Sequence, residues 1–275
     1  MATITASDLD RFRARVDDVV AGHPAVRSNQ YTAWFATGEA TDEEVRHLTV
    51  QFSVFSHLFV EAQLRKCINA TTLETYRAGK EILLNELGVS FNGKVDDEGV
   101  ATEGTVDGGR FKFGAAHFEW LLRFAKPLGL EFGDLGKPRN ATPATRQFCE
   151  ELLRIYGSED PSTAEGASYA VEHWAASGFW KELIAGLRAY KERAHPELNL
   201  GFWTWHDRVE DQHAAHTADE LTEAFGEPWF DGERFLAAGA EMLDGVQVFW
   251  DGLWQDHLGG GEEDGPGAPA APATT

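Results

Sequence analysis

Apolar residues along most of this chain recur at spacings of three and four, the period of an α-helix with one buried face. The run Thr41-Asp-Glu-Glu44 has a capping-box pattern and predicts the start of a long helix that ends near Asn69. No segment alternates apolar and polar residues for long enough to build a substantial sheet. We therefore predict an all-α bundle of seven to nine helices, over residues 7–21, 27–35, 41–69, 71–88, 113–126, 143–156, 161–192, 200–224 and 230–256.

Two segments depart from the helical period. Residues 89–112 are rich in turn-forming residues, as in Val106-Asp-Gly-Gly-Arg110, and predict a small hairpin. Residues 258–275 are rich in Gly, Pro and Ala, so burial cannot offset the entropy lost on ordering them, and we predict a disordered tail. Residues 1–257 are then a single helical domain.

Charge and composition exclude several functions. The 275 residues include 24 Lys and Arg against 45 Asp and Glu, a net charge of −21. A field of this sign repels nucleic acid and anionic membrane surfaces, so neither is expected as a partner. The sequence has no apolar stretch long enough to span a membrane and no signal-peptide pattern. Because Cys67 and Cys149 cannot form a disulfide framework, we expect a reducing compartment and a cytoplasmic protein.

The most informative polar pattern is His206-x3-Glu210-x2-His213. At about 100° per residue these positions lie near 0°, 40° and −20° around a helix, so their side chains share one face. Two imidazoles and a carboxylate form a three-ligand set for a metal such as iron or manganese. The polar surface of an exposed helix explains the same pattern, so the set alone leaves both interpretations open.

Three more polar residues interrupt apolar helix faces. Glu86 lies at the end of one predicted helix, His117 near the start of the next, and Glu172 in the middle of a later one. A buried carboxylate without a partner is costly, and helical bundles build metal sites from ligands on several helices. With the 206–213 face, these residues supply three carboxylates and three imidazoles, a shell suited to two irons.

The ordered set resembles the haem-oxygenase-like di-metal oxidases and oxygenases, relatives of the thiaminase II and pyrroloquinoline-quinone-synthase fold. The neighbouring sequence is also similar to that family over about residues 40–225, in the segments Asn85-Glu-Leu-Gly88, 117–130 and 172–187. The resemblance implies a haem-oxygenase-like helical bundle whose metal ligands are Glu86, His117, Glu172, His206, Glu210 and His213. Two features differ from the family: Asp is commoner where Glu210 stands, and the gap before His117 is longer. Glu81 and Glu61 are alternatives for the first ligand.

The same resemblance implies two Fe(II) ions, with Mn as an alternative, and O2 as co-substrate. An external electron donor and a small-molecule substrate are the expected partners, and the sequence leaves a homodimer open. Because acidic surroundings suit a cation, we favour N-oxygenation of an amino-acid-type amine in small-molecule biosynthesis. Oxidative C–C cleavage or desaturation of an amino acid or fatty acid is the alternative, and a non-catalytic metal- or ligand-binding protein is the alternative of another class. Six aromatic residues are expected either to shield the metals from water or simply to pack the core: Phe118, Trp120, Trp174, Phe202, Trp203 and Trp205.

Other site chemistries are less favoured. A ferritin-like centre needs a second Glu-x-x-His motif, and Glu44-x-x-His47 occupies the first turn of a helix, where Glu44 is already expected to cap. Haem ligation would use His57, which fits a core or pocket position better. Thiaminase-like hydrolysis would need a reactive Cys67 or Cys149, and both lie in ordinary helical surroundings.

Overall fold

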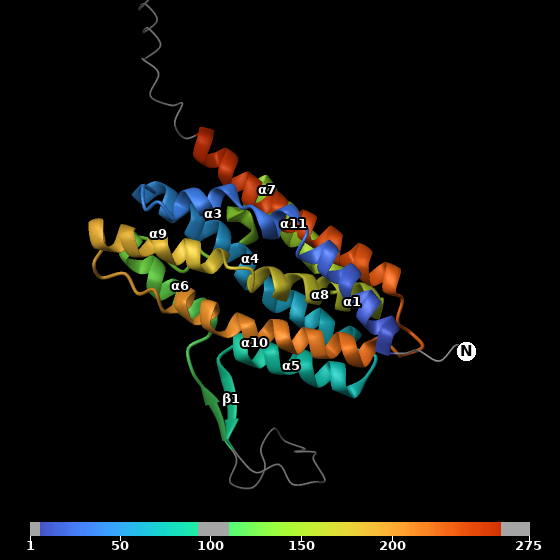
Figure 1. Cartoon of the computed structure of the whole chain (residues 1–275). Helices are drawn as coiled ribbons and strands as arrows, with labels where there is room; N and C mark the ends of the chain where they lie inside the picture. The colour runs from blue at the N-terminus through green and yellow to red at the C-terminus, as the bar shows by residue number, and fades with distance from the viewer. Residues whose placement is uncertain (1–5, 93–109, 260–275) are drawn as a thin grey trace, which may run out of the picture.

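The computed structural model describes the backbone of residues 6–92 and 110–259, and their side chains except those of residues 90–92, 110–113 and 209–216. Eleven α-helices, two 3-10 helices and one hairpin make up this part of the chain (Figure 1). The helices are α1 (Ala6–Val20), α2 (Pro24–Arg27), α3 (Gln30–Phe35), α4 (Asp42–Asn69), α5 (Leu73–Glu86), α6 (His117–Ala125), α7 (Pro143–Ile155), α8 (Pro161–Ala175), α9 (Phe179–Arg193), α10 (Gly201–Ala224) and α11 (Gly232–Gly259). The prediction of an all-α fold is confirmed.

Helix α8 lies at the centre of the bundle. It packs against α11 on one side and α10 on the other, while α4 packs against α5, α6 and α7. Gly166 of α8 makes the first contact a close one, because a Cβ at this position would lie 2.2 Å from the carbonyl oxygen of Phe235 in α11. Long helices that pack side by side in this way bury one continuous core (Figure 1).

Local signals in the sequence explain where the helices begin. The Thr41 hydroxyl accepts a hydrogen bond from the backbone N–H of Glu44, and a carboxylate oxygen of Glu44 accepts one from the backbone N–H of Thr41 at 2.7 Å. This capping box is the predicted one. At the starts of α5, α7 and α8, the side chains of Thr72, Thr142 and Asp160 each accept a hydrogen bond from a backbone N–H of the first turn, without the reciprocal bond.

The prediction of seven to nine helices was too low for two reasons. The predicted helix 27–35 corresponds to α3, which Asn29 caps, and the short helix α2 just before it was not predicted. The predicted helix 161–192 is α8 and α9, separated at Gly178, whose φ of 105° lies in the left-handed region that glycine adopts easily. The apolar period continues across this break, and periodicity alone therefore does not reveal it.

The turn-rich segment begins and ends in a two-stranded antiparallel hairpin, as predicted. Strand β1 (Val89–Asn92) pairs with β2 (Arg110–Phe113), with Val89 opposite Phe113. The hairpin projects away from the helices between α5 and α6 (Figure 1). Residue 113 belongs to β2, so α6 starts four residues later than predicted. At the other end, α11 continues to Gly259, and residues 260–275 of the predicted tail lie outside the described residues.

The core is unusually aromatic. Phe52, Trp203 and Trp250 are almost fully buried and contact several other rings each. Among the described residues, no helix combines the length and apolar character that a membrane span requires.

Candidate metal centre

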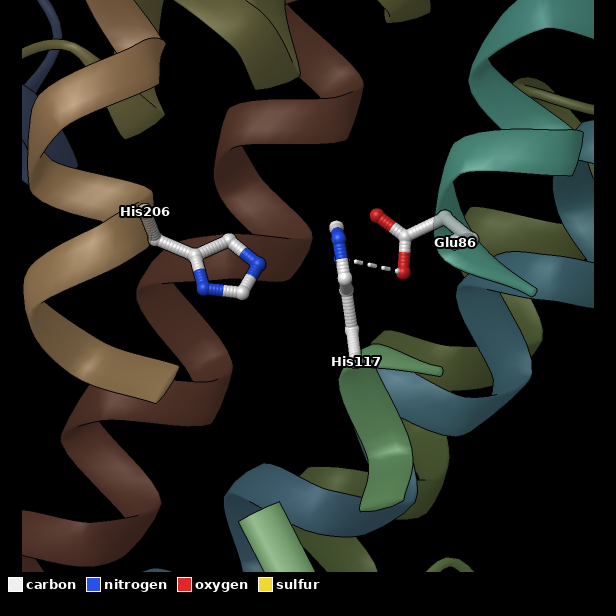
Figure 2. A group of neighbouring side chains, drawn as sticks. All are labelled: Glu86, His117 and His206. Atoms are coloured by element: carbon white, nitrogen blue, oxygen red, sulfur yellow. Dashed lines mark ion pairs between the residues drawn. The ribbon is translucent and has the colours of Figure 1, made fainter. Parts of the chain in front are cut away.

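The site begins with a contact between two helix ends. Glu86 is the last residue of α5 and His117 the first of α6, and a carboxylate oxygen of Glu86 lies 3.0 Å from Nδ1 of His117 (Figure 2). The His117 side chain is 3% exposed and that of Glu86 13%. Both polar groups are therefore largely removed from water, where a charge needs a partner.

The hairpin brings these two ends together. Gly88 turns the chain out of α5 with a φ of 67°, and its carbonyl oxygen accepts a hydrogen bond of 2.7 Å from the backbone N–H of Gly114. The pairing of Val89 with Phe113 returns the chain to the same place. The hydrogen bond and the strand pairing at the base of the hairpin therefore bring Glu86 and His117 into contact, although a long segment separates them in the sequence.

His206 of α10 adds a second imidazole. One ligand atom each from Glu86, His117 and His206 lie within 4.8 Å of one another, and Figure 2 shows the His117 ring between the other two side chains. Nδ1 of His206 lies 2.7 Å from the carbonyl oxygen of Phe202, so the proton of the neutral ring is on Nδ1. Nε2 then carries the lone pair, which is the form in which imidazole binds a metal.

Aromatic rings enclose the two imidazoles. The His117 ring stacks on Trp120 with centroids 5.0 Å apart and meets the edge of Trp205 at 4.4 Å. The His206 ring stacks on Trp180 at 5.0 Å with an interplanar angle of 18°. These contacts restrict ring rotation, so the nitrogen atoms are held in place before any ligand arrives.

The site opens on a small, partly open cavity with a volume of about 60 Å³, which we call the chamber. Glu86, His206 and Glu172 contribute to its wall, and Glu172 is 5% exposed. Most of the remaining wall is apolar, including Phe52, Phe55, Phe59, Ile82, Phe179 and Phe202. Glu172 therefore borders the same space as Glu86 and His206, two members of the cluster.

Two of the predicted ligands are not placed by this geometry. The backbone of Glu210 and His213 is helical within α10, and their side chains lie outside the described residues. The shared face of His206, Glu210 and His213 stays a prediction.

The alternative residues lie elsewhere. Glu61 pairs with Arg65 on the surface at 2.8 Å, and Glu81 is exposed. Glu44 contacts His257 at 2.6 Å in addition to its capping role, and His47 pairs with Asp256 at 2.9 Å. Neither Glu44 nor His47 thus forms part of the cluster around His117.

The two cysteines and His57 are also engaged in packing. Burial raises the pKa of Cys149 to about 12 and also raises that of Cys67, so neither is a thiolate at neutral pH. The His57 ring packs on Phe118, with centroids 4.5 Å apart.

Only some of the aromatic residues around the site were predicted from the sequence. Trp174 and Phe202 line the chamber, and Trp120 and Trp205 pack on His117, whereas Trp203 lies deeper, against Phe52 and Phe124. Phe118 faces His57 and Phe132 instead.

Trp180 and Phe179 were not singled out, although both line the chamber. Gly178, directly before them in the sequence, could have indicated their position, because it marks the break between α8 and α9 after which both residues line the chamber.

The donor set fits a metal. Two imidazoles and one carboxylate, largely buried and converging from three helices, match the ligands that iron and manganese take in proteins. His117 supports this assignment because its buried Nδ1 has no hydrogen-bond donor or acceptor of good geometry among the described residues, only the nearby Glu86 carboxylate. Glu172 is the one further carboxylate among the described residues of the chamber wall.

Comparison with known proteins shows the fold. No protein-family profile matches the chain, and no curated protein is detectably similar in sequence. A domain of unknown function with a haem oxygenase-like fold from Shewanella denitrificans OS217 superposes with a TM-score of 0.59 at 14% identity, covering 97% of this chain and 100% of its own.

Two further solved structures are similar. A TenA homologue from Pseudomonas syringae pv. tomato DC3000 has a TM-score of 0.62 at 11% identity, covering 91% of this chain and 92% of its own. A CADD-like protein of unknown function from Nostoc punctiforme PCC 73102 has a TM-score of 0.61 at 17% identity, covering 93% and 98%. The chain therefore has a haem-oxygenase-like fold, and identities this low extend no further than the fold.

Proposed function

We propose that this haem-oxygenase-like protein is a non-haem di-iron oxidase or oxygenase that uses O2 to oxidise a small metabolite. One observation carries the proposal: Glu86, His117 and His206 offer ligand atoms within 4.8 Å of one another at the wall of an apolar chamber. Bound iron would supply the electrons that activate O2, which no side chain of the site can do alone.

Each residue of the cluster has a distinct part in holding the metals. His206 presents Nε2 because Phe202 accepts its Nδ1 proton, and Trp180 keeps the ring in that orientation. The Glu86 carboxylate partly offsets the metal charge at a buried position. We propose that Glu172, Glu210 and His213 complete a site for two ions, as the resemblance of the sequence implies.

The chamber would position the substrate and exclude water. Its wall of Phe and Trp side chains cannot donate or accept protons in competition with the reacting group, and it limits the escape of a reactive oxidant. The described residues that line it include neither Lys nor Arg, so nothing there pairs with the carboxylate of a free amino acid. We therefore narrow the expected N-oxygenation to an amine whose remainder is apolar, with oxidative C–C cleavage or desaturation of an apolar chain as the alternative.

The proposal has a direct test. The purified protein is titrated anaerobically with Fe(II), and then O2 uptake is followed after addition of a reductant such as dithionite-reduced ferredoxin or ascorbate. About two irons bound per chain with O2 uptake well above that of free Fe(II) is the expected result. A chain that binds no iron, and whose melting temperature iron does not change, would instead be a non-catalytic binding protein. One iron per chain with O2 uptake would point to a mononuclear centre on Glu86, His117 and His206.

A matched variant separates site chemistry from adventitious iron. His206→Gln keeps an amide of similar reach and removes the imidazole, and it should abolish both iron binding and O2 uptake. His57→Gln makes the same change outside the chamber and should leave both intact.

A further inference from the structure

Positive charge is unevenly distributed along this acidic chain. Residues 110–139 carry six Lys and Arg against three Asp and Glu, whereas the other residues carry 18 against 42. The segment includes α6, whose first residue is His117 of the candidate metal centre. A local excess of positive charge therefore accompanies a proposed metal ligand in a protein whose net charge is −21.

Two tryptophans lie between His117 and the surface. The His117 ring contacts both Trp120 of α6 and Trp205 of α10, and the two indoles contact each other with centroids 5.4 Å apart. Both tryptophans are partly exposed, whereas the imidazole is buried. A single layer of rings thus separates this imidazole from solvent on one side of the molecule.

Each tryptophan has an exposed arginine as its neighbour on the same helix. Arg123 follows Trp120 by three residues in α6, and Arg208 follows Trp205 by three residues in α10, a spacing that places side chains side by side. No carboxylate among the described residues forms an ion pair with either arginine. The carboxylate of Glu119, which is nearby in α6, accepts a hydrogen bond from the backbone at the start of that helix.

The two arginines lie at opposite ends of the tryptophan pair, because α6 and α10 run antiparallel. Trp120 contacts Trp205. Phe124, one turn further along α6, contacts Trp203, which comes before Trp205 in α10. We call the surface formed by the tryptophan pair with Arg123 and Arg208 the tryptophan face.

The tryptophan face is suited to supply electrons to the metal centre. The proposed function needs electrons from outside, and because electron transfer slows steeply with distance, a donor has to dock where a metal ligand is close to the surface. His117 is such a ligand at this face. Neither Trp120 nor Trp205 lines the chamber, so a donor docked on them leaves the chamber free for the substrate.

We propose that the tryptophan face docks a small acidic one-electron carrier protein, such as a [2Fe–2S] ferredoxin. The carrier's role as electron donor rests on the proposed function; its docking does not. Arg123 and Arg208 would attract its carboxylates on a molecule that otherwise repels them, and the indoles would supply the aromatic contact that is common in the cores of interfaces. Each reduced carrier gives up one electron and leaves oxidised, so two encounters return two ferric ions to the ferrous state.

The size of the face favours this partner over other anions. Two arginines beside a metal ligand make a small contact surface, as is typical of weak electron-transfer encounters. A nucleic acid or an anionic membrane is held by a wider set of Lys and Arg side chains.

Docking is measured without added iron. Oxidised plant-type ferredoxin, an acidic [2Fe–2S] protein, is titrated into the full chain in a calorimeter. The double variant Arg123→Glu with Arg208→Glu should weaken binding at least about tenfold. Raising the salt from about 20 to about 200 mM NaCl should weaken binding to the wild type by a similar factor, because exposed charges are screened.

A second double variant controls for net charge. Arg146→Glu with Arg188→Glu makes the same change of charge at exposed arginines of α7 and α9, outside the tryptophan face. It should leave the affinity for ferredoxin within about twofold of the wild type. Vesicles of phosphatidylcholine with phosphatidylserine are tested in parallel as the competing anionic surface.

The electron itself is followed in a further measurement. The chain is loaded with ferric iron and mixed under argon with reduced ferredoxin, whose visible absorbance reports its oxidation. Arg123→Glu with Arg208→Glu should slow this oxidation at least about tenfold at low salt. Reduction by hydroquinone, a small uncharged donor that needs no docking surface, should be unchanged.

Three results would overturn the proposal: no binding of ferredoxin to the wild type, equal losses in the two double variants, or vesicle binding that depends on Arg123 and Arg208. Iron binding and O2 uptake in a chain that does not bind ferredoxin would leave the di-iron function standing and remove only this inference. Ferredoxin that docks on the tryptophan face of a chain without iron would confirm the docking and remove both the di-iron function and the carrier's role as donor.

Discussion

Nδ1 of His117 lies 3.0 Å from the carboxylate of Glu86, although the whole turn-rich segment separates the two residues in sequence. The contact depends on the base of the hairpin, where Gly88 and Gly114 are joined by a backbone hydrogen bond. An insertion that lengthens the chain between two ligands is harmless when its ends are paired, because the pairing restores the distance between them.

Replacement of either described imidazole should remove the metal. His117→Ala and His206→Ala each delete one of three converging ligands, and we expect iron binding to weaken at least about tenfold, since even an outer partner of a metal ligand contributes that much. The measurement is iron per chain after desalting, with circular dichroism to show that the helices remain. The same loss is expected for His213→Ala on the basis of the sequence pattern.

Controls for this prediction lie outside the cluster. His57→Ala and His216→Ala should retain most of the iron. Full iron binding in both His117→Ala and His206→Ala would contradict the assignment of the site.

The turn at Gly88 should be necessary for the site. Alanine there would adopt a φ of 67°, which is unfavourable for an L-residue, and its Cβ would lie 2.8 Å from the backbone of Ala115. We expect Gly88→Ala to lower the free energy of unfolding by about 2 kcal/mol and to weaken iron binding. Gly114→Ala is the matched control, because the nearest atom to its Cβ is 3.5 Å away. Equal effects of the two substitutions in urea unfolding and iron titration would argue against a role for the Gly88 turn.

A buried lysine away from the chamber should contribute strongly to stability. Lys66 is 3% exposed, and its ammonium group lies 2.9 Å from the Ser168 hydroxyl, 3.3 Å from Glu165 and 3.8 Å from Glu220. Lys66→Ala leaves two poorly solvated carboxylates close together, so we expect the free energy of unfolding in urea to fall by about 3 kcal/mol.

Its neighbour on α4 is the comparison. Arg65 pairs with Glu61 at 2.8 Å with both side chains about half exposed, and Arg65→Ala should change the free energy of unfolding by less than about 1 kcal/mol. Similar losses for the two variants would mean that the burial of Lys66 does not control the effect.

Acid should destabilise the protein partly through His57. Burial, with a smaller contribution from the charge of Lys137, lowers the pKa of His57 in the folded protein below its usual value near 6.5. The unfolded chain therefore binds this proton more readily, and stability falls as the pH drops below about 6.5. In His57→Gln, unfolding midpoints measured between pH 8 and 5 should decline less steeply than in the wild type. An unchanged slope would show that other groups carry the acid sensitivity.

Much of the fold was predictable because its signals are local. The capping box at Thr41 and the cap at Thr72 place helix starts to within two residues, since the capping side chain and the N–H that it pairs with are close in sequence. The break at Gly178 was missed because the apolar period continues through it. Whether the chain turns at this glycine depends on how α9 packs against α3 and α10.

The candidate site was likewise predictable in part, because some of its features belong to single helices and others depend on how the helices pack. Residues with suitable chemistry were visible in the sequence: Glu86, His117 and Glu172 as polar groups in apolar helix faces, and His206 through the spacing of ligand-type residues along one helix. Both signals are properties of a single helix. Three features of the site follow from packing alone: a hairpin closes the gap from Glu86 to His117, Phe202 selects the tautomer of His206, and Trp180 rather than Trp203 borders the chamber. These facts depend on distances between helices, and a helical period specifies the direction of a side chain without specifying the partner that packing brings to it.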